Sequence, residues 1–502
     1  MVLFKTNGHL YAANNRCPHE GYPLAEGTFN PEKCLLTCNW HNWKFEMNTG
    51  KNISGEDDLN IYDTKIDDGN VWIHIPEIPK TKIAVRIFEQ LRDAFNNQSY
   101  DRIVRELTKL HFEGLDLLDG VRKAIEWSYD RLEYGMDHAY AVTADWLVLF
   151  NEFPQMEEKL ICLAESVDYI SESSLRQPEF AYTSRVTSFS KPEFLKSIEE
   201  EDEESAVAMV NGALSDGLHF ADLEAALSKA ALCHYNDFGH SLIYVTKISR
   251  LIEILGAESE RYLLPSLTRS ICYATREDLL PEFRNLQTHI EKWNKPDGSP
   301  DEPAELMGRP TESLMEWVSN QAQSENPKRL YEKLVKLSAR NLLHYDMSYQ
   351  FSYSHQVSKN IGWLDFTHAL TFGNAVRKQC SKFPELWKYG LLEMACFIGR
   401  NHKFLDRTVE ESQWIVSDRQ QFFEDCINLI LDHGKSTPIF PAHYVKTMLA
   451  VREELEFAGE DCAKYLLAGL NRFLHSPLKE KHVRRTIRQA LSLVGKEYVV
   501  SL

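Results

Sequence analysis

Four side chains near the N-terminus have the types and spacing of a metal-cluster ligand set. They form two pairs, Cys17-x-His19 and Cys38-x-x-His41, with 18 residues between His19 and Cys38. Each pair supplies one thiolate and one imidazole, as a [2Fe–2S] centre with two Cys on one iron and two His on the other requires. A zinc site is the alternative, but zinc sites of this composition usually place the His pair after the Cys pair. The spacing therefore predicts a [2Fe–2S] cluster that moves single electrons.

The segments that hold these ligands resemble the Rieske [2Fe–2S] family. They read RCPHEGYPLAEG from Arg16 and LTCNWHNWKF from Leu36, and the resemblance covers residues 1 to about 76. It implies that Cys17, His19, Cys38 and His41 bind the cluster. The alternating segments VLFKTNGHLYA, CLLTCNW, WKFEM and VWIHI predict a small antiparallel sheet. Turns are predicted at Asn7-Gly8, Thr49-Gly50 and Gly69-Asn70.

The chain departs from the respiratory members of that family at the two loops. Those members carry a disulfide between the loops, where this chain has Tyr22 and Trp40, and a hydrogen-bonding Ser after the last ligand, where it has Asn42 and Trp43. Fewer hydrogen bonds to sulfur lower the reduction potential, so we expect the lower half of the roughly −150 to +300 mV Rieske range. The family also usually has further strands before VLFKTNGHLYA, so we expect a shortened or unusual N-terminus.

Beyond a proline-containing linker, IPEIPK, the apolar period changes from that of strands to that of helices. Nine segments show helical spacing: IAVRIFEQLRDAF, YDRIVRELTKL, LDGVRKAIEWSY, LEAALSKAAL, HSLIYVTKISRLIEIL, SLMEWVSNQA, LYEKLVKLSARNLL, LWKYGLLEMACFIG and YVKTMLAVREELEF. We predict roughly 16 to 20 helices. The predicted order is a small all-β domain at 1–78, a linker and first helices at 79–120, and a large all-α domain at 121–502, with a loop or seam at 294–310.

The predicted cluster relays electrons and therefore needs an acceptor. The sequence has no glycine-rich nucleotide fingerprint, so metal is the favoured internal candidate. Asp237-x-x-His240 and Asp365-x-x-His368 each place a carboxylate and an imidazole on one helical face, and His138 is a further candidate ligand. A 2-His-1-carboxylate set suits Fe(II) and oxygen, which predicts a second, non-haem iron. The alternative is that these pairs are capping or packing features.

A second resemblance concerns the helices. The segments LEYGMDHAYAV, HYNDFGHSLIYVTKISRLIEILG and WLDFTHALTFGNAVR are similar to the questin oxidase-like family over about residues 125 to 400. That family is helical and associated with oxygen-dependent Baeyer–Villiger cleavage of aromatic polyketides. The resemblance implies that His138, His240 and His368 line an active cavity. The familiar Rieske oxygenase ligand set, Asp-x-x-His and a second His five residues on, is absent because those later positions are Val245 and Gly373.

The composition limits the classes of binding partner and the location of the protein. The formal net charge is −18 over 502 residues, which argues against nucleic acid because phosphate binding needs clustered Lys and Arg. We expect the exception, a basic run near the end, to be the solvated face of a helix; it comprises Lys479, Lys481, Arg484, Arg485 and Arg488. With no run of 18 apolar residues and no signal-peptide pattern, we expect no membrane span and a cytoplasmic location.

These observations lead to one hypothesis and two alternatives. In the hypothesis, an NAD(P)H-fed reductase or a ferredoxin reduces the cluster, which passes single electrons to an oxygen-activating site in the helices. The substrates would be O2 and an apolar or aromatic small molecule. The expected catalytic residues are His138, Asp237, His240, Asp365 and His368. The alternatives are a ferredoxin-like carrier whose helices are a docking scaffold for a partner, and a redox sensor.

Overall fold

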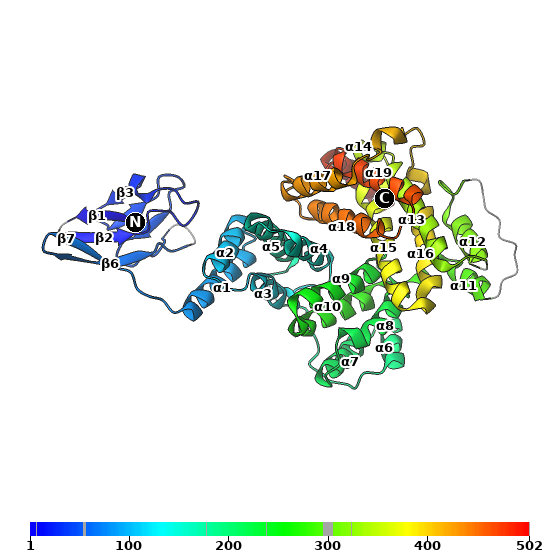
Figure 1. Cartoon of the computed structure of the whole chain (residues 1–502), viewed down its shortest axis with the longest axis horizontal. Coiled ribbons are helices and arrows are strands. Elements are labelled where there is room, and N and C mark those ends of the chain that lie inside the picture. The colour runs from blue at the N-terminus through cyan, green and yellow to red at the C-terminus, as the bar shows by residue number, and fades with distance from the viewer. Residues whose placement is uncertain are drawn as a thin grey trace. The chain divides into compact units, whose positions relative to one another are not determined.

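The chain divides into a β-rich unit and a helical unit. The computed structural model describes residues 1–6, 8–53, 57–176, 178–236, 238–294, 305–322 and 324–500. Contacts group Met1–Ile83 into one compact unit and Ala84–Leu502 into another. Figure 1 shows the strands of the first unit and the helices of the second. A small β domain followed by a large helical region is thus confirmed, with α1 to α20 at the upper end of the expected helix count.

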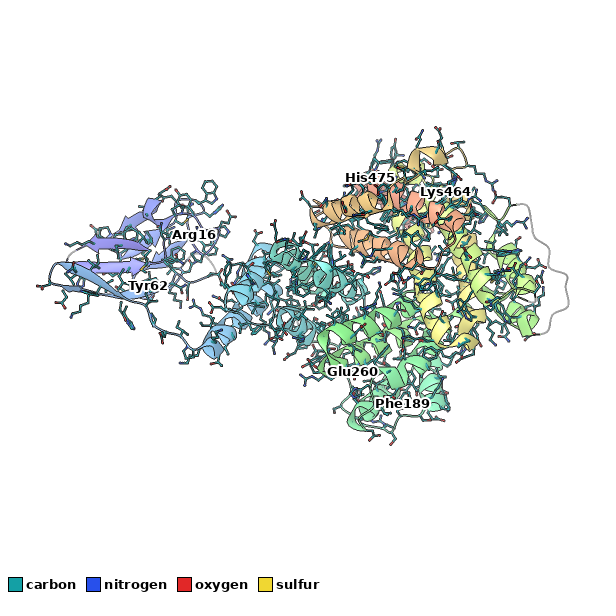
Figure 2. All side chains as sticks on the ribbon, viewed as in Figure 1. Arg16, Tyr62, Phe189, Glu260, Lys464 and His475 are labelled. Atoms are coloured by element: carbon teal, nitrogen blue, oxygen red, sulfur yellow. The ribbon has the colours of Figure 1, made fainter. Side chains whose placement is uncertain are left out.

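Two antiparallel sheets build the N-terminal unit. The first has the order β1-β2-β6-β7, from Val2–Thr6, His9–Ala13, Ile61–Asp67 and Asn70–His74. The second has the order β3-β4-β5, from Thr28–Asn30, Leu35–Thr37 and Lys44–Glu46. Their buried side chains form one core that includes the two predicted ligand cysteines: Val2, Ala13, Cys17, Leu24, Leu36, Cys38, Phe45, Met47 and Leu59. Figure 2 labels Tyr62 on β6 and Arg16 just before Cys17.

One predicted turn lies a residue earlier than expected. Asp67 pairs with Asn70 across the β6–β7 hairpin, so the turn residues are Asp68 and Gly69 and not Gly69 and Asn70. Their φ angles are 53° and 76°. A two-residue type I′ turn needs positive φ at both central positions, and Asp-Gly is a favoured sequence for it.

The helical unit follows directly on the linker, with α1 beginning at Lys80 after Pro79. The helices through α10 are α1 Lys80–Asn96, α2 Tyr100–Phe112, α3 Leu118–Ser128, α4 His138–Glu152, α5 Met156–Ser173, α6 Lys191–Glu199, α7 Glu203–Ser215, α8 Phe220–Ala231, α9 His240–Leu255 and α10 Glu260–Tyr273. The remaining helices are α11 Leu286–Asn294, α12 Thr311–Gln321, α13 Pro327–Leu343, α14 Ser348–Phe351, α15 Trp363–Lys382, α16 Trp387–Arg400, α17 Arg419–Leu431, α18 Ile439–Glu454, α19 Glu460–His475 and α20 Val483–Val500. A short ladder joins β8 His234–Tyr235 to β9 Thr275–Arg276. Most of the predicted seam at 294–310 lies outside the described residues.

Four helices form the centre of this unit. The helix α4 packs against α9 and α18, and α15 packs against the same two helices. Apolar side chains lie on most sides of α4 and α18, as expected for helices surrounded by protein. The other helices cover this four-helix core, with α5 on α4 and α13 and α16 on α15. None of the described helices is both long and apolar enough to cross a membrane.

Polar contacts hold the covering helices in place. The Glu260 carboxylate of α10 (labelled in Figure 2) accepts the backbone N–H of Phe220 and contacts the His219 ring, which fixes the start of α8. The backbone N–H of Thr187 donates to the Ala208 carbonyl, which ties an irregular segment to α7.

The basic run near the C-terminus is only in part a solvated face, because Lys481, Arg484 and Arg488 are exposed but Arg485 is not. The Arg485 guanidinium of α20 is buried and donates to backbone carbonyls in the segment 349–352, while Arg484 and Arg488 lie over the Tyr353 ring. The apolar face of α20 is exposed as well, at 58% for Val483, 57% for Ile487 and 69% for Leu491. The expectation is wrong for Arg485, because its guanidinium donates to backbone carbonyls of the neighbouring segment.

Candidate metal centres

The two predicted ligand loops have the same backbone design. Cys17 begins a turn between β2 and β3, and Cys38 begins one between β4 and β5. In both loops the Cys N–H donates to the carbonyl five residues on, and the residue four positions on donates back to the Cys carbonyl, at 2.8–3.0 Å. That fourth residue is Gly21 in one loop and Asn42 in the other, with φ of 75° and 62°. Gly and Asn are the residues that tolerate the left-handed region best.

The four donor groups are placed for a shared cluster. The Nδ1 atoms of His19 and His41 face one another at 3.0 Å. Both cysteines are buried, and burial raises the pKa of the Cys17 thiol to about 11, with the adjacent Cys38 thiol adding to the rise. Thiolate is the form that binds iron, so iron would displace that proton. The donor set fits two irons, with sulfur ligands inside the core and nitrogen ligands at its rim.

Aromatic rings surround the rim. Trp43 stacks on His19 with ring centres 4.6 Å apart, and Trp40 meets the edge of His41 at 5.7 Å. Tyr22 stacks on Trp40 at 5.8 Å, so a ring pair connects the loops at the two positions where respiratory members have a disulfide. The His41 side chain is exposed and 30% of the His19 side chain is accessible, so the ligand edge is open to an electron-transfer partner.

Comparison with known proteins agrees with this geometry. Residues 1–62 match the model of the Rieske [2Fe–2S] domain. The chain is 30% identical over 79 residues to the 3-phenylpropionate/cinnamic acid dioxygenase ferredoxin subunits of Shigella flexneri serotype 5b (strain 8401) and Escherichia coli (strain K12), which covers 15% of this chain and 74% of each relative. The chain belongs to the Rieske [2Fe–2S] family. The Rieske domain therefore implies a [2Fe–2S] cluster and an electron-carrier role.

A further relative belongs to another oxygenase system. The Rieske domain is 31% identical over 81 residues to the alkene monooxygenase system ferredoxin component of Xanthobacter autotrophicus (strain ATCC BAA-1158 / Py2). This alignment covers 16% of the chain and 66% of that relative. No solved structure matches the chain.

A second group of ligand atoms converges inside the four-helix core. The helices α4, α9, α15 and α18 each contribute one histidine to it: His138, His240, His368 and His443. The His240 Nε2 atom lies 2.9 Å from His138 Nε2 and 2.8 Å from His368 Nε2, and His443 Nε2 lies 3.2 Å from His368 Nε2. All four helices present the histidine in their first or second turn, and the four rings form one layer, which we call the histidine layer.

Proton sharing alone does not satisfy the histidine layer. The His368 Nε2 atom has three nitrogen neighbours, in His240, His443 and Lys446, the last at 3.1 Å. A ring nitrogen offers one proton or one lone pair, so it can satisfy one of the three. A cation at the centre would satisfy all the rings. Metal–imidazole bonds of about 2.0–2.1 Å place neighbouring ligand nitrogens about 3 Å apart, close to the observed spacing.

The protonation of the layer also suits a metal. Burial holds the pKa values of His138, His368 and His443 well below the usual range, so these rings are neutral, as ligands must be. The Nδ1–H of His443 donates to the Ile439 carbonyl at 2.6 Å, which directs its Nε2 lone pair into the layer. Burial likewise lowers the pKa of the Lys446 amine, which reduces its repulsion of a nearby cation.

The predicted ligands are partly brought together. His138, His240 and His368 converge, whereas the Asp365 carboxylate accepts the Gly362 N–H at 2.7 Å in a capping box at the start of α15. Asp237 lies outside the described residues. Sequence reasoning missed His443, because a search for Asp-x-x-His pairs does not find it. It also missed Lys446, one turn later on the same helix.

Two unusual backbone positions place His240 beside His368. Gly239, at φ 80°, begins α9 so close to α15 that a Cβ there would lie 2.2 Å from the Phe372 ring. Phe372 is one turn beyond His368, so this approach sets the distance between the two rings. Phe238 has φ 57°, a conformation that costs a non-glycine residue about 1–2 kcal/mol, and its ring stacks on His368 at 5.5 Å.

The start of α4 is fixed in a similar way. A Cβ at Gly135 would lie 2.3 Å from the Ser266 carbonyl oxygen, so only glycine lets this loop reach α10. The Asp137 carboxylate accepts the Ala139 N–H at 2.9 Å and caps the helix. His138 thereby enters the first turn of α4 with its ring toward α9.

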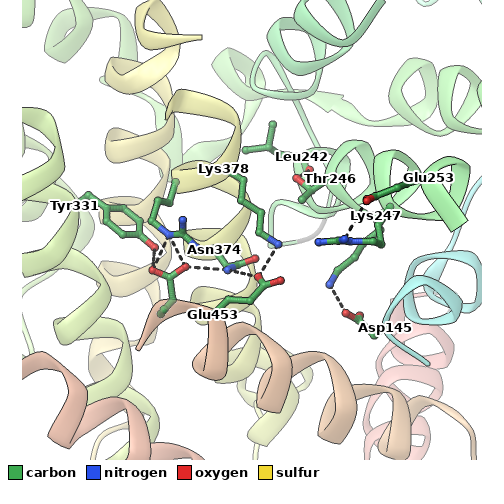
Figure 3. A network of polar contacts seen from close by, with 12 residues as sticks. Asp145, Leu242, Thr246, Lys247, Glu253, Tyr331, Asn374, Lys378 and Glu453 are labelled. Atoms are coloured by element: carbon green, nitrogen blue, oxygen red, sulfur yellow. Dashed lines mark hydrogen bonds and ion pairs between the residues drawn. The ribbon is translucent and has the colours of Figure 1, made fainter. Parts of the chain in front are cut away.

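Ion pairs connect the same four helices two to three turns further along each helix (Figure 3). Asp145 follows His138 by two helical turns and pairs with Lys247, which follows His240 by the same interval, at 2.5 Å. Lys378 of α15 pairs with Glu453 of α18, also at 2.5 Å. Because residues seven apart share a helix face, this ion-pair layer holds the helices that carry the histidines.

A pocket of about 510 Å³ reaches the histidine layer. His138 and His240 belong to its lining, so a molecule inside it would meet the edge of the layer. The lining is part aromatic and apolar, including Leu132, Tyr134, Met136, Tyr244 and Tyr273.

Proposed function

We propose that this chain is a two-part oxidoreductase in which the Rieske cluster supplies single electrons to a non-haem iron held by the histidine layer. The observation that carries the proposal is the convergence of four imidazoles on one point in a buried core. Imidazole suits iron, and a redox-active metal gives the electrons of the cluster a destination. When bound, the iron would supply oxygen activation.

The residues around the site fit oxidation of a small molecule. His138 and His240 would hold the metal at the end of the pocket, and Tyr134, Tyr244 and Tyr273 would offer ring faces to an apolar or aromatic substrate. The packed core on the other sides of the layer excludes water from the reacting centre. The exposed His19–His41 edge would accept electrons from an external NAD(P)H-fed reductase or a ferredoxin.

The relatives supply further support. The printed names of two kinds of relative assign them to a dioxygenase and a monooxygenase system, in which they are the ferredoxin components. In this chain the same kind of domain precedes a large helical unit with its own histidine layer. We propose that this unit takes the place of the separate oxygenase.

Metal analysis of the full chain tests the proposal. Protein purified anaerobically should hold iron beyond the two atoms of the cluster. His240→Ala and His368→Ala should lose this extra iron and keep the Rieske electron paramagnetic resonance signal. His289→Ala is the matched control, because His289 is equally buried but bonds to Ser319 and Glu312 elsewhere. Extra iron that survives both layer variants would refute the assignment.

The second candidate is an electron carrier whose helical unit is a docking scaffold. It is favoured by the relatives, which are named as ferredoxins. It predicts no metal beyond the cluster in wild-type protein, and electron transfer to an added partner enzyme that is unchanged in His240→Ala.

A further inference from the structure

We propose that Phe238 is the electron-entry residue of the histidine layer, and that Arg400 marks the surface where the electron donor docks. The inference rests on the proposed function, because it needs a redox-active metal at the layer. It names the face through which that metal would be reduced.

The route consists of three stacked groups. The Phe238 ring lies nearly parallel to the His368 ring, at 16° and 5.5 Å between centres. The Arg400 guanidinium lies over the Phe238 ring at 4.4 Å. Phe238 is partly exposed, and 34% of the Arg400 side chain is accessible. Electron transfer weakens steeply with distance and with gaps in packing, so a continuous stack from the surface to a ligand ring is a favourable path.

The surroundings hold the ring in place. The Phe238 N–H donates to the Tyr235 hydroxyl at 3.0 Å, and Arg400 also donates to that hydroxyl, at 3.3 Å. The Phe397 ring packs on Phe238 at 6.0 Å. A bulky residue at positive φ is held by its surroundings, and such strain concentrates at functional positions.

Electrons and substrate would then reach the histidine layer from different sides. Phe238 and Arg400 are not among the residues that line the 510 Å³ pocket, whereas His138 and His240 are. A donor over Arg400 would therefore leave the pocket open to substrate. A reduced cluster with two thiolates and two neutral imidazoles carries a net negative charge, and Arg400 is a cation that Glu282 partly neutralises at 3.6 Å.

The redox step is a single-electron exchange. The reduced [2Fe–2S] cluster loses one electron and returns to its oxidised state, and the ferric ion held by the histidine layer gains that electron and becomes ferrous. No bond forms or breaks in this step.

Stopped-flow kinetics on the full chain with cluster and metal loaded tests the route. The cluster is reduced anaerobically, and its reoxidation by the ferric site is followed by absorbance. Phe238→Leu, which removes the ring, should slow the transfer at least several-fold with cluster and metal contents unchanged. Phe238→Tyr, which keeps a ring, should restore the rate. The transfer rate is also measured at several protein concentrations. It is independent of concentration if the donor cluster lies in the same chain, and it falls on dilution if the donor lies in another copy.

Arg400→Glu provides an independent test that leaves the ring in place. It should slow the transfer several-fold at low salt, with a smaller effect at high salt, because screening weakens charge steering. Arg419→Glu is the control: Arg419 is similarly accessible at 45% and also paired with a glutamate, but lies on α17. If Phe238→Leu loses the metal, the rate of electron transfer in Arg400→Glu tests the route by itself.

The outcomes separate this inference from the proposed function. If wild-type protein binds no reducible metal at the histidine layer, the proposed function fails and this inference fails with it. If wild-type transfer occurs but Phe238→Leu or Arg400→Glu transfers electrons at the wild-type rate with its metal in place, the entry route alone is overturned.

Discussion

Replacing Gly239 with alanine tests how the histidine layer is assembled. The new Cβ would lie 2.2 Å from the Phe372 ring, and the backbone would keep a φ of 80°. The left-handed conformation costs about 1–2 kcal/mol and overpacking about 1–3 kcal/mol, so we expect the free energy of unfolding to fall by about 2–5 kcal/mol. Relief of the clash would push the start of α9 away from α15. His240 would then leave His368, and the helical unit would lose its metal.

Gly217→Ala is the matched control for that experiment. Gly217 has nearly the same φ, 78°, and nothing lies within 4 Å of the position of its Cβ. Urea denaturation followed by the helical circular dichroism signal gives the free energy of unfolding of both variants, and elemental analysis gives their metal content. The Rieske signal should be unchanged in both. If Gly239→Ala loses no more stability than Gly217→Ala and keeps its metal, close approach at Gly239 does not position His240.

Three further predictions concern the ion-pair layer, pH and the cluster. Lys247→Met should cost the helical unit about 3–5 kcal/mol of unfolding free energy by leaving the buried Asp145 carboxylate unpaired, and Asp145→Leu added to it should recover much of the loss in the same urea assay. Because burial lowers the pKa values of His138, His368 and His443, the unfolded chain binds more protons below about pH 6.5. Stability of the metal-free protein should therefore be greatest above that pH and fall as the pH drops below it. If the free energy of unfolding of His443→Gln depends on pH as steeply as that of the wild type, the buried histidines do not cause the pH dependence. The cluster should titrate in the lower half of the roughly −150 to +300 mV range by redox-monitored paramagnetic resonance, and a value in the upper half would show that other groups set the potential.

Features encoded by short segments were predictable from the sequence. The ligands Cys17, His19, Cys38 and His41 follow a fixed local spacing, and the apolar period of HSLIYVTKISRLIEIL matches the bounds of α9. The strands β3 and β6 were missed. β3 has three residues, and the charged side chains of β6 hide its alternation.

The histidine layer depends on contacts that the sequence does not display. His138 and His443 are about 300 positions apart, and their meeting follows from how α4 packs against α18. Asp365 shows the reverse problem, because a carboxylate three residues before a histidine suits both a metal ligand and a helix cap. In the structure the Asp365 carboxylate accepts the backbone N–H of Gly362, so it acts as a helix cap.

The Tyr22–Trp40 stack has a consequence for how the Rieske domain withstands its surroundings. A disulfide across the same gap would open in the presence of thiols, and the loops would then be free to separate. Two rings in contact have no bond for a reductant to cleave. The ligand loops of this protein should therefore keep their spacing in strongly reducing media, including those needed to charge the cluster itself.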